Sequence, residues 1–194
     1  MAIDSYMSFL RYDGTYLAAE SQVDLSKNKE PLMTELYTLA SPNIFEVEDY
    51  SFDIEQTLNI GSQSSGAGAG KVSFNPVSIT RKIDCASALF FEMACSGTAF
   101  QAVTLALRKS VGASAGGADV SGMIFLRFDF KLVAVKTISW AHDDESPKET
   151  VTFEYGGLQI RYAQQLPSGE LKTPMKGGWN RVKNIKDQTA DKIS

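Results

Sequence analysis

The chain has 194 residues, with 19 Lys and Arg against 23 Asp and Glu, which gives a formal net charge of −4 at pH 7. This balance lacks the basic excess of a nucleic-acid-binding domain, and no apolar run approaches the ~20 residues of a membrane-spanning helix. We therefore expect neither nucleic acid as a partner nor insertion into a membrane.

The N-terminus carries Asp4, Arg11 and Asp13 where a signal peptide would need an apolar stretch, which favours synthesis as a soluble cytoplasmic protein. Its alternating residues 5–14, SYMSFLRYDG, predict a first strand. Residues 26–45, with Pro31 and Pro42, show no clear pattern beyond one potential helical turn. No linker rich in proline or charge divides the chain, so residues 1–194 are expected to form a single domain.

The clearest alternation lies between residues 50 and 60. The apolar set is Tyr50, Phe52, Ile54, Leu58 and Ile60, and the polar set is Ser51, Asp53, Glu55, Thr57 and Asn59. Period-two patterning is typical of a strand that is half covered by a core. We therefore expect one continuous strand here, with one face buried and one face wet.

The next stretch, GSQSSGAGAGKVSFNP at residues 61–76, resembles a phosphate-binding loop in composition. A P-loop needs a glycine five positions before its Gly-Lys pair and a Ser or Thr directly after the Lys. Ser65 and Val72 occupy these two positions, so both ends of the motif are absent. A phosphate loop also opens a helix, whereas the residues that follow are β-branched. We expect a flexible Gly/Ser connection and no cofactor.

Residues 72–83 predict another strand, with a change of parity at Pro76. The apolar positions are Val72 and Phe74, and then Val77, Ile79 and Ile83. Because proline lacks the N–H that a sheet ladder uses, Pro76 is expected to mark a bulge or an edge position.

Residues 87–97 instead have the three- and four-residue spacing of a short helix. Ser87 is expected to be its N-cap and Gly97 to end it. Its apolar positions, assigned to core packing, are Leu89, Phe90, Met93 and Ala94. On one helix, Cys85 and Cys95 would lie ~15 Å apart, beyond the ~7 Å that a disulfide spans. We expect both to be free thiols, buried as small apolar residues.

Three further alternating segments, residues 99–109, 122–140 and 149–165, predict strands. In the second, Arg127, Asp129 and Lys131 fall on the polar face. In the third, the apolar parity changes across Gly156 and Gly157, which predicts a bulge that bends the strand. The fold class expected is mainly β, an antiparallel β-barrel or sandwich with one short α-helix at its flank.

No set of residues assembles into a catalytic or metal site. His142 and the acidic residues Asp143, Asp144 and Glu145 suggest metal ligands, but consecutive residues of a hairpin loop point apart, and a solvated turn is favoured. A single histidine also excludes most triads and multi-histidine zinc sites. Trp140 and Trp179 are expected to pack or to cover an interface rather than to stack on a ligand.

Several ordered segments between residues 50 and 184 together resemble the Hcp family (haemolysin-coregulated protein) of bacterial type VI secretion. They are EVEDYSFDIEQ, GAGAGKVSFNPVSITRKID, CASALFFEMACSG, AFQAVTLALRKS and ETVTFEYGGLQIRYAQQLPSGELKTPMKGGWNRVKN. The most specific are GAGKV leading into SITRKID, the TLALRK strand, and the closing Gly-Trp pair.

The resemblance implies a structural protein that performs no catalysis. Subunits of this family form hexameric rings that stack into a hollow tube, carry effector cargo proteins in the lumen, are capped by a VgrG-type spike protein and lie inside a contractile sheath. The chain would then be cytoplasmic and afterwards secreted without a cleaved signal peptide. Its partners would be copies of itself, the spike, the sheath and the cargo.

The resemblance also implies roles for two sets of residues. In the family, the segment matching residues 61–71 is an extended loop that packs one ring onto the next. The ring-stacking residues would be Gly61, Ser64, Ser65, Gly66, Gly68, Gly70 and Lys71. The polar residues Ser51, Asp53 and Glu55 could line the lumen or could simply face solvent, and neither interpretation is preferred.

Three segments depart from the family pattern: residues 18–45 are longer, residues 110–122 carry extra small residues, and a tail of about residues 185–194 runs past the usual end. Two alternatives remain open. A small-ligand or carbohydrate-binding β-barrel would gather Trp140 and Trp179 on one concave face. A thiol enzyme would use Cys85 or Cys95 with a depressed pKa.

Overall fold

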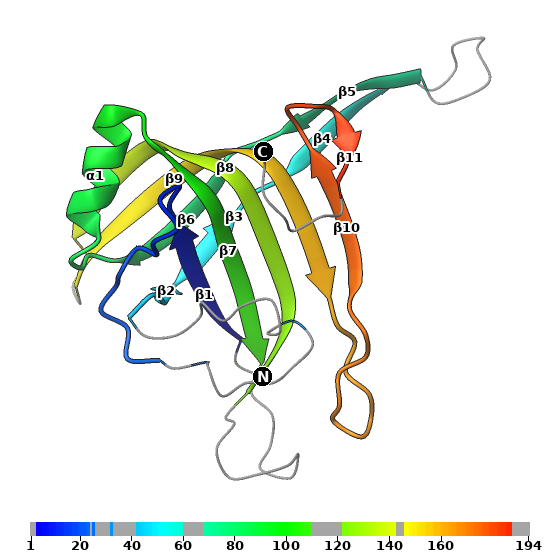
Figure 1. Ribbon diagram of the computed structural model, residues 1–194, viewed down its shortest axis with the longest axis horizontal. Coiled ribbons are helices and arrows are strands. Elements are labelled where there is room, and N and C mark those ends of the chain that lie inside the picture. The colour runs from blue at the N-terminus through cyan, green and yellow to red at the C-terminus, as the bar shows by residue number, and fades with distance from the viewer. Residues whose placement is uncertain are drawn as a thin grey trace.

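The computed structural model describes residues 3–23, 25, 32, 42–59, 68–109, 122–142 and 146–187. Within these ranges most strands join one twisted antiparallel sheet with the order β11-β10-β9-β8-β7-β1-β2 (Figure 1). Its strands are β1 (Ile3–Leu10), β2 (Phe45–Val47), β7 (Ala99–Lys109), β8 (Met123–His142), β9 (Pro147–Tyr162), β10 (Met175–Asn180) and β11 (Ile185–Lys186). Strand β11 lies inside residues 185–194, which the sequence predicts to be a tail.

The long strand β9 belongs to both layers of the fold. Its first half pairs with β6 (Val77–Lys82), which in turn pairs with β3 (Asp49–Ser51), and its second half pairs with β10. Only Glu48 separates β2 from β3, so the chain itself connects the two edge strands of the sheet. Among the described strands no ladder of backbone hydrogen bonds joins β2 to β3 or β6, so the sheet stays open. The antiparallel prediction is confirmed, and the result is a β-sandwich with an open seam rather than a closed barrel.

Aromatic rings fill the space between the layers. Phe9 of β1 lies at the centre, and its ring centroid is 4.9 to 5.6 Å from those of Phe45, Phe90, Phe100 and Phe153. All five side chains are almost fully buried. Such rings bury large apolar areas and prefer edge-on or tilted contacts, so this cluster holds the helix and both layers together.

The bend between the layers occurs where two glycines face a strained residue. Tyr155 and Leu158 are three positions apart, and both lie in the core. The alternation of inward and outward residues along β9 therefore changes across Gly156 and Gly157, as predicted. The predicted bulge, however, is not at this position, because β8 and β9 keep the same register on both sides of it. Instead Leu132, opposite Gly156, has φ 51°, and the register shifts between Val135 and Thr137. A side chain on Gly156 would press on Leu132.

The helix α1 (Ser87–Ser96) lies at the flank of the sandwich and packs against β8 (Figure 1). Gly97 ends it in the left-handed conformation at φ 69°, as predicted. The N-cap prediction is wrong: Ala86 caps the helix without a side-chain bond, and the Ser87 hydroxyl donates to Glu149 Oε1 at 2.9 Å. Ser87 is therefore used to attach the helix to β9.

The predicted strand of residues 50–60 is two strands. Tyr50 in β3 and Phe52 pack against the core, whereas β4 (Ile54–Asn59) leaves the sandwich, and Ile54 is 44% exposed. Pro76 lies between β5 (Gly68–Phe74) and β6, at the point where the chain passes from the small sheet into the main one. It marks this transition and not a bulge. Beyond it, buried Arg81 takes an inward position, and Ile83 is exposed.

Candidate assembly surfaces

A two-stranded arm projects from the sandwich (Figure 1). Its strands β4 and β5 pair with each other in a sheet of their own, with Ile54 opposite Phe74 at the base and Asn59 opposite Gly68 further out. Three predicted ring-stacking residues, Gly68, Gly70 and Lys71, lie in β5. The other four, Gly61, Ser64, Ser65 and Gly66, lie outside the described residues.

The base of the arm is fixed by a pair of polar residues. Asn75 donates its backbone N–H to the carbonyl oxygen of Asp53 at 3.1 Å, and its side-chain amide donates to Asp53 Oδ2 at 2.8 Å. Phe74 is buried beside Tyr155, with ring centroids 6.2 Å apart. The arm therefore leaves the body at a defined point and direction.

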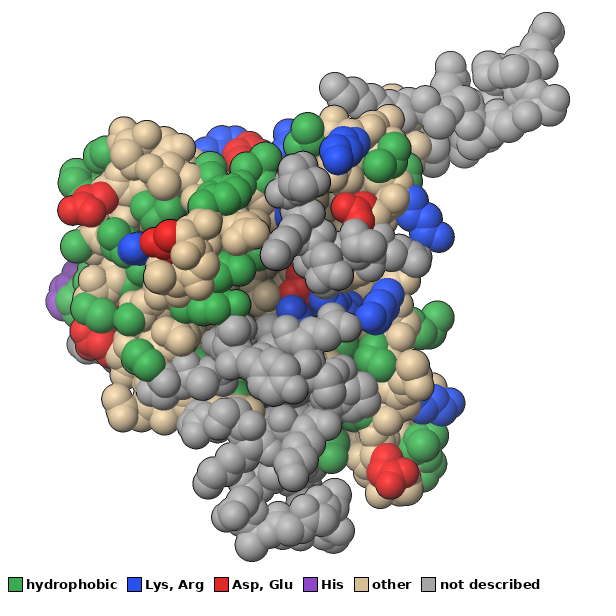
Figure 2. Space-filling view, viewed as in Figure 1, with side chains coloured by type: hydrophobic (Ala, Val, Ile, Leu, Met, Phe, Trp, Pro, Cys, Tyr) green, Lys and Arg blue, Asp and Glu red, His purple; other side chains and the backbone are tan. Residues whose placement is uncertain are grey.

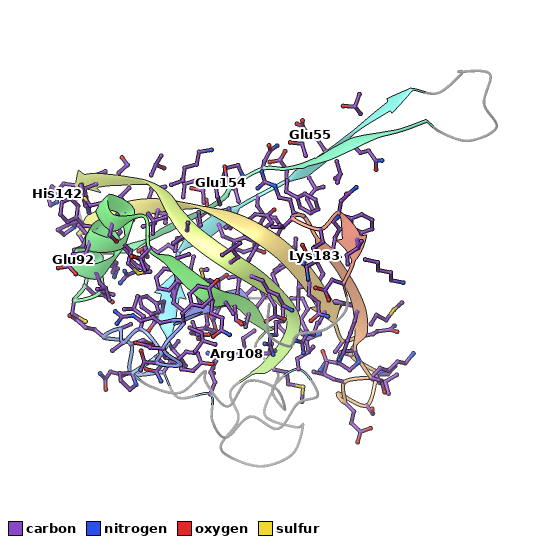
Figure 3. All side chains as sticks on the ribbon, turned by 45° about the horizontal axis from the view of Figure 1, so that its top comes forward. Glu55, Glu92, Arg108, His142, Glu154 and Lys183 are labelled. Atoms are coloured by element: carbon purple, nitrogen blue, oxygen red, sulfur yellow. The ribbon has the colours of Figure 1, made fainter. Side chains whose placement is uncertain are left out.

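The three residues predicted for a lumen wall are all exposed, but they do not lie on one continuous strand. Ser51 ends β3, Asp53 lies in the connection, and Glu55 lies on the arm (Figure 3). Their alternation in sequence is therefore spread along the path from the sandwich to the arm. A lumen role for these residues stays a prediction.

The two tryptophans are far apart. Trp140 lies near the end of β8, 52% exposed, with its ring centroid 6.3 Å from that of Phe91 on α1. Trp179 on β10 pairs with Leu158, which pairs with Phe130 of β8. Ten residues of extended strand therefore separate the two positions, roughly 33 Å. The structure does not bring them onto one concave, ligand-stacking face.

The cysteine environments do not match that of a reactive thiol. Cys85 and Cys95 are free as predicted, but both are exposed, so the expectation that they are buried is wrong. The backbone N–H of Cys85 donates to Glu20. Partial burial, followed by the charges of Asp84 and Glu20, raises the pKa of the Cys85 thiol. A nucleophilic cysteine needs the opposite shift.

A buried ionic cluster on the outer face of the sheet was not predicted. Arg127 donates to Asp129 Oδ1 at 2.7 Å, Thr104 donates to the same oxygen at 2.9 Å, and Arg161 Nε lies 3.2 Å from Asp129 Oδ2. Sequence alternation assigned Arg127 and Asp129 to a wet face, yet both are buried. Arg127 also donates to the Leu32 carbonyl at 3.3 Å, so Leu32 contributes to the cover of this face.

A groove of about 540 Å³ follows the open seam. It is lined by the start of β1, by β2 and by the end of β6, and its carboxylates are Asp4, Glu20, Glu46, Glu48 and Asp84. All five already bind neighbours. Glu20 accepts the backbone N–H of Cys85 and Glu46 accepts the Ser21 hydroxyl. Asp4, Glu48 and Asp84 pair with Arg108, Lys148 and Arg81 respectively. Across the described ranges no three His, Cys, Asp or Glu side chains are grouped to hold a metal ion. No helix in these ranges has the length and apolarity to cross a membrane.

Comparison with known protein families gives one match, to the model described as type VI secretion system effector, Hcp, over residues 35–162. This match spans more than half of the chain. The chain belongs to the Hcp family. The family predicted from the ordered sequence segments is thereby confirmed, and the chain is a type VI secretion protein of mainly β structure. No match was found among curated proteins.

Solved structures show that the fold is also that of Hcp proteins. A type six secretion system protein matches with a TM-score of 0.73 at 21% identity, covering 96% of this chain and 100% of its own. Hcp1 from Salmonella typhimurium matches with a TM-score of 0.64 at 23% identity, over 96% and 100%. Hcp3 from Pseudomonas aeruginosa matches with a TM-score of 0.58 at 16% identity, over 92% and 98%. The fold therefore extends beyond the matched residues to nearly the whole chain.

Proposed function

We propose that this Hcp-family chain is a non-enzymatic tube subunit, which forms hexameric rings that stack into a hollow tube with effector cargo in its lumen. A VgrG-type spike would cap the tube and a contractile sheath would surround it. The chain would be made in the cytoplasm and leave it with the tube. The observation that carries the proposal, beside family membership, is the projecting arm.

The arm is poorly explained as part of an isolated subunit. A two-stranded hairpin is only marginally stable in water by itself, and β4 and β5 present backbone edges that another chain can pair with. Ile54 at its base is 44% exposed, and Glu55, Gln56 and Thr57 are exposed as well. Contact with the adjacent ring would cover these edges and stabilise the arm. Glycines such as Gly68 and Gly70 allow close approach of a neighbouring backbone.

The proposal is tested by measuring size and shape. Size-exclusion chromatography with light scattering is expected to give a particle far larger than the 21.2 kDa chain, and negative-stain images are expected to show rings. A strict monomer at micromolar concentration would refute the proposal. For the arm, a variant shortened between Ser62 and Gly70 should keep the ring but lose stacking into tubes. Alanine at Pro167 and Ser168, in an exposed turn, is the matched control, and equal stacking by both variants would contradict the role of the arm.

The lumen assignment has its own test. Replacing Ser51 and Glu55 together with lysine should leave ring size unchanged, because both side chains are exposed. Asp53 is kept in this variant, because its carboxylate accepts a hydrogen bond from Asn75 at the base of the arm. If Ser51 and Glu55 line the lumen, co-purification of an acidic or basic cargo protein should change with the reversed charge. Unchanged capture of both kinds of cargo would place these residues on the outer surface.

A further inference from the structure

The outward face of α1 is unusually apolar for a surface helix. Its exposed residues are Ala88, Phe91, Glu92, Cys95 and the terminal Ser96. They follow helical spacing and lie opposite the buried Phe90 and Met93. Trp140 of β8 extends this surface, since its ring contacts Phe91 and both side chains are 52% exposed. We call Ala88, Phe91, Glu92, Cys95 and Trp140 the helix surface.

A second apolar surface continues the core face of the sheet at its other end. In the register of β9 with β10, Met175 lies opposite Tyr162, Gly177 opposite Ile160, and Trp179 opposite Leu158. Opposite residues share a face of the sheet, and here only Leu158 is buried. We call Ile160, Tyr162, Met175, Gly177 and Trp179 the β10 surface.

The β10 surface has an open gap above Gly177. A Cβ on Gly177 would meet no heavy atom within 4 Å apart from its chain neighbours, so this surface carries no side chain at its centre. Met175 beside this gap is 78% exposed. Methionine adapts its shape and makes favourable contacts with aromatic rings. An aromatic ring such as that of Phe91 matches this setting in chemistry.

The charges around the two surfaces are complementary. Residues 83–100, which include α1, contain Asp84 and Glu92 and no Lys or Arg. Residues 171–186, which include β10 and β11, contain no acid and five basic residues, Lys172, Lys176, Arg181, Lys183 and Lys186. Figure 2 shows basic side chains over the β10 side, whereas the end that carries α1 is mainly hydrophobic with acidic groups. Figure 3 places Glu92 and Lys183 at opposite ends.

We propose that the helix surface of one copy binds the β10 surface of the next copy, with Phe91 at Gly177 and Glu92 among the lysines. This deepens the proposed self-assembly and rests on it. Because the two surfaces differ and lie up to roughly 30 Å apart along β8, the contact is heterologous. An open chain of copies therefore always keeps one free surface of each kind, one at each end. Further copies can be added through this contact until the rotation between neighbouring copies closes the chain into a ring.

The test uses one variant for each surface. Phe91→Lys blocks the helix surface, because it places a cation against the lysines around the β10 surface. Met175→Glu blocks the β10 surface, because it places an acid against Glu92 of the neighbouring copy. Both residues are largely exposed, so the circular dichroism spectrum should stay that of wild type. Ile3→Glu, at a residue 54% exposed at the start of β1 and outside both surfaces, is the matched control. Each blocking variant alone should lose the ring, and Ile3→Glu should keep it.

Mixing the two blocking variants gives the decisive result. Each still has one intact surface, so an equimolar mixture should form a 1:1 dimer of twice the chain mass that grows no further. Rings that survive Phe91→Lys, or a mixture that stays monomeric, would overturn this inference while wild-type rings leave the proposed function standing. A wild-type chain that never assembles would overturn both. Equal loss of rings with Ile3→Glu would also overturn the inference.

Discussion

The attachment of α1 to the sheet depends on a buried ion pair. Arg81 NH1 lies 2.8 Å from Glu149 Oε1, which also accepts the Ser87 hydroxyl. The two side chains are 3% and 0% exposed. The guanidinium also pairs with Asp84 and lies over the rings of Phe45 and Phe90, 4.9 and 5.6 Å from their centroids. Removing one partner would leave a buried charge with less compensation.

We expect Glu149→Leu to destabilise the chain by about 3 to 5 kcal/mol, the range for breaking a buried pair. Arg81→Met should cost a similar amount, because it leaves the Glu149 carboxylate buried without its cation. Replacing both at once removes the Arg81–Glu149 pair but leaves Asp84 without its cation, so the double variant is expected to cost clearly less than the sum of the two single variants without becoming neutral. The two single costs therefore should not add, and the coupling should be several kcal/mol.

The assay is denaturant unfolding of the four proteins in the double-mutant cycle, followed by circular dichroism at one fixed protein concentration, since assembly also shifts apparent stability. The exposed pair Lys136–Glu154 has the same 2.8 Å distance, with side chains 48% and 37% exposed, and is the matched control. Its coupling should stay within about 1 kcal/mol. Equal coupling in both cycles, or additive costs at Arg81 and Glu149, would refute the argument from burial.

Three further predictions concern single positions. Gly97→Ala, at φ 69°, should lower the free energy of unfolding by about 1 kcal/mol because alanine resists the left-handed conformation, and Ser96→Ala measured beside it should cost less. Hydrogen bonds from Lys136 and Arg181 lower the pKa of Glu154 in the folded protein. The ionised carboxylate therefore stabilises the folded state at pH values above its pKa in the unfolded chain, and this stabilisation is lost as the pH falls through its pKa in the folded protein. Glu154→Gln should abolish this part of the acid dependence of the free energy of unfolding. Burial raises the pKa of Tyr155 to about 12, so stability should fall as pH rises above ~10, where the unfolded phenol ionises first. A Tyr155→Phe chain that loses stability equally in this range would contradict the assignment.

The alternation of apolar and polar residues predicted the positions of most strands, but it could not show which other residues cover the polar face of the sheet. The strands of residues 99–109 and 122–142 follow directly from apolar residues at every second position. The same pattern gave Arg127 and Asp129 to solvent. They are buried beside Leu32, which is distant in the sequence, and period two carries no information about such a contact.

The surfaces for assembly were foreseen only in part. Residues 68–71 were predicted as part of a flexible Gly/Ser connection, yet they lie in strand β5, and the residues between β4 and β5 lie outside the described ranges. The apolar residue Ile54 suggested a core strand where the arm leaves the body. The gap at Gly177 depends on the register of β10 with β9, which the sequence does not specify. Ser87 looked like a cap because its partner, Glu149, lies 62 residues further along the chain.

The pairing of β1 has a consequence for the order of folding. Ile3 pairs with Lys109 and Leu10 with Ala102, so β1, which has only a three-residue ladder with β2, finds its long ladder only after about a hundred more residues have been added. At about 5 to 20 residues per second, this is a delay of several seconds on the ribosome. During that time Met7 and Phe9, both fully buried in the finished protein, have no core to enter. Early release of the nascent chain would therefore expose an unpaired apolar strand to aggregation, and the yield of folded protein should depend on keeping that strand apart from other chains until β7 emerges.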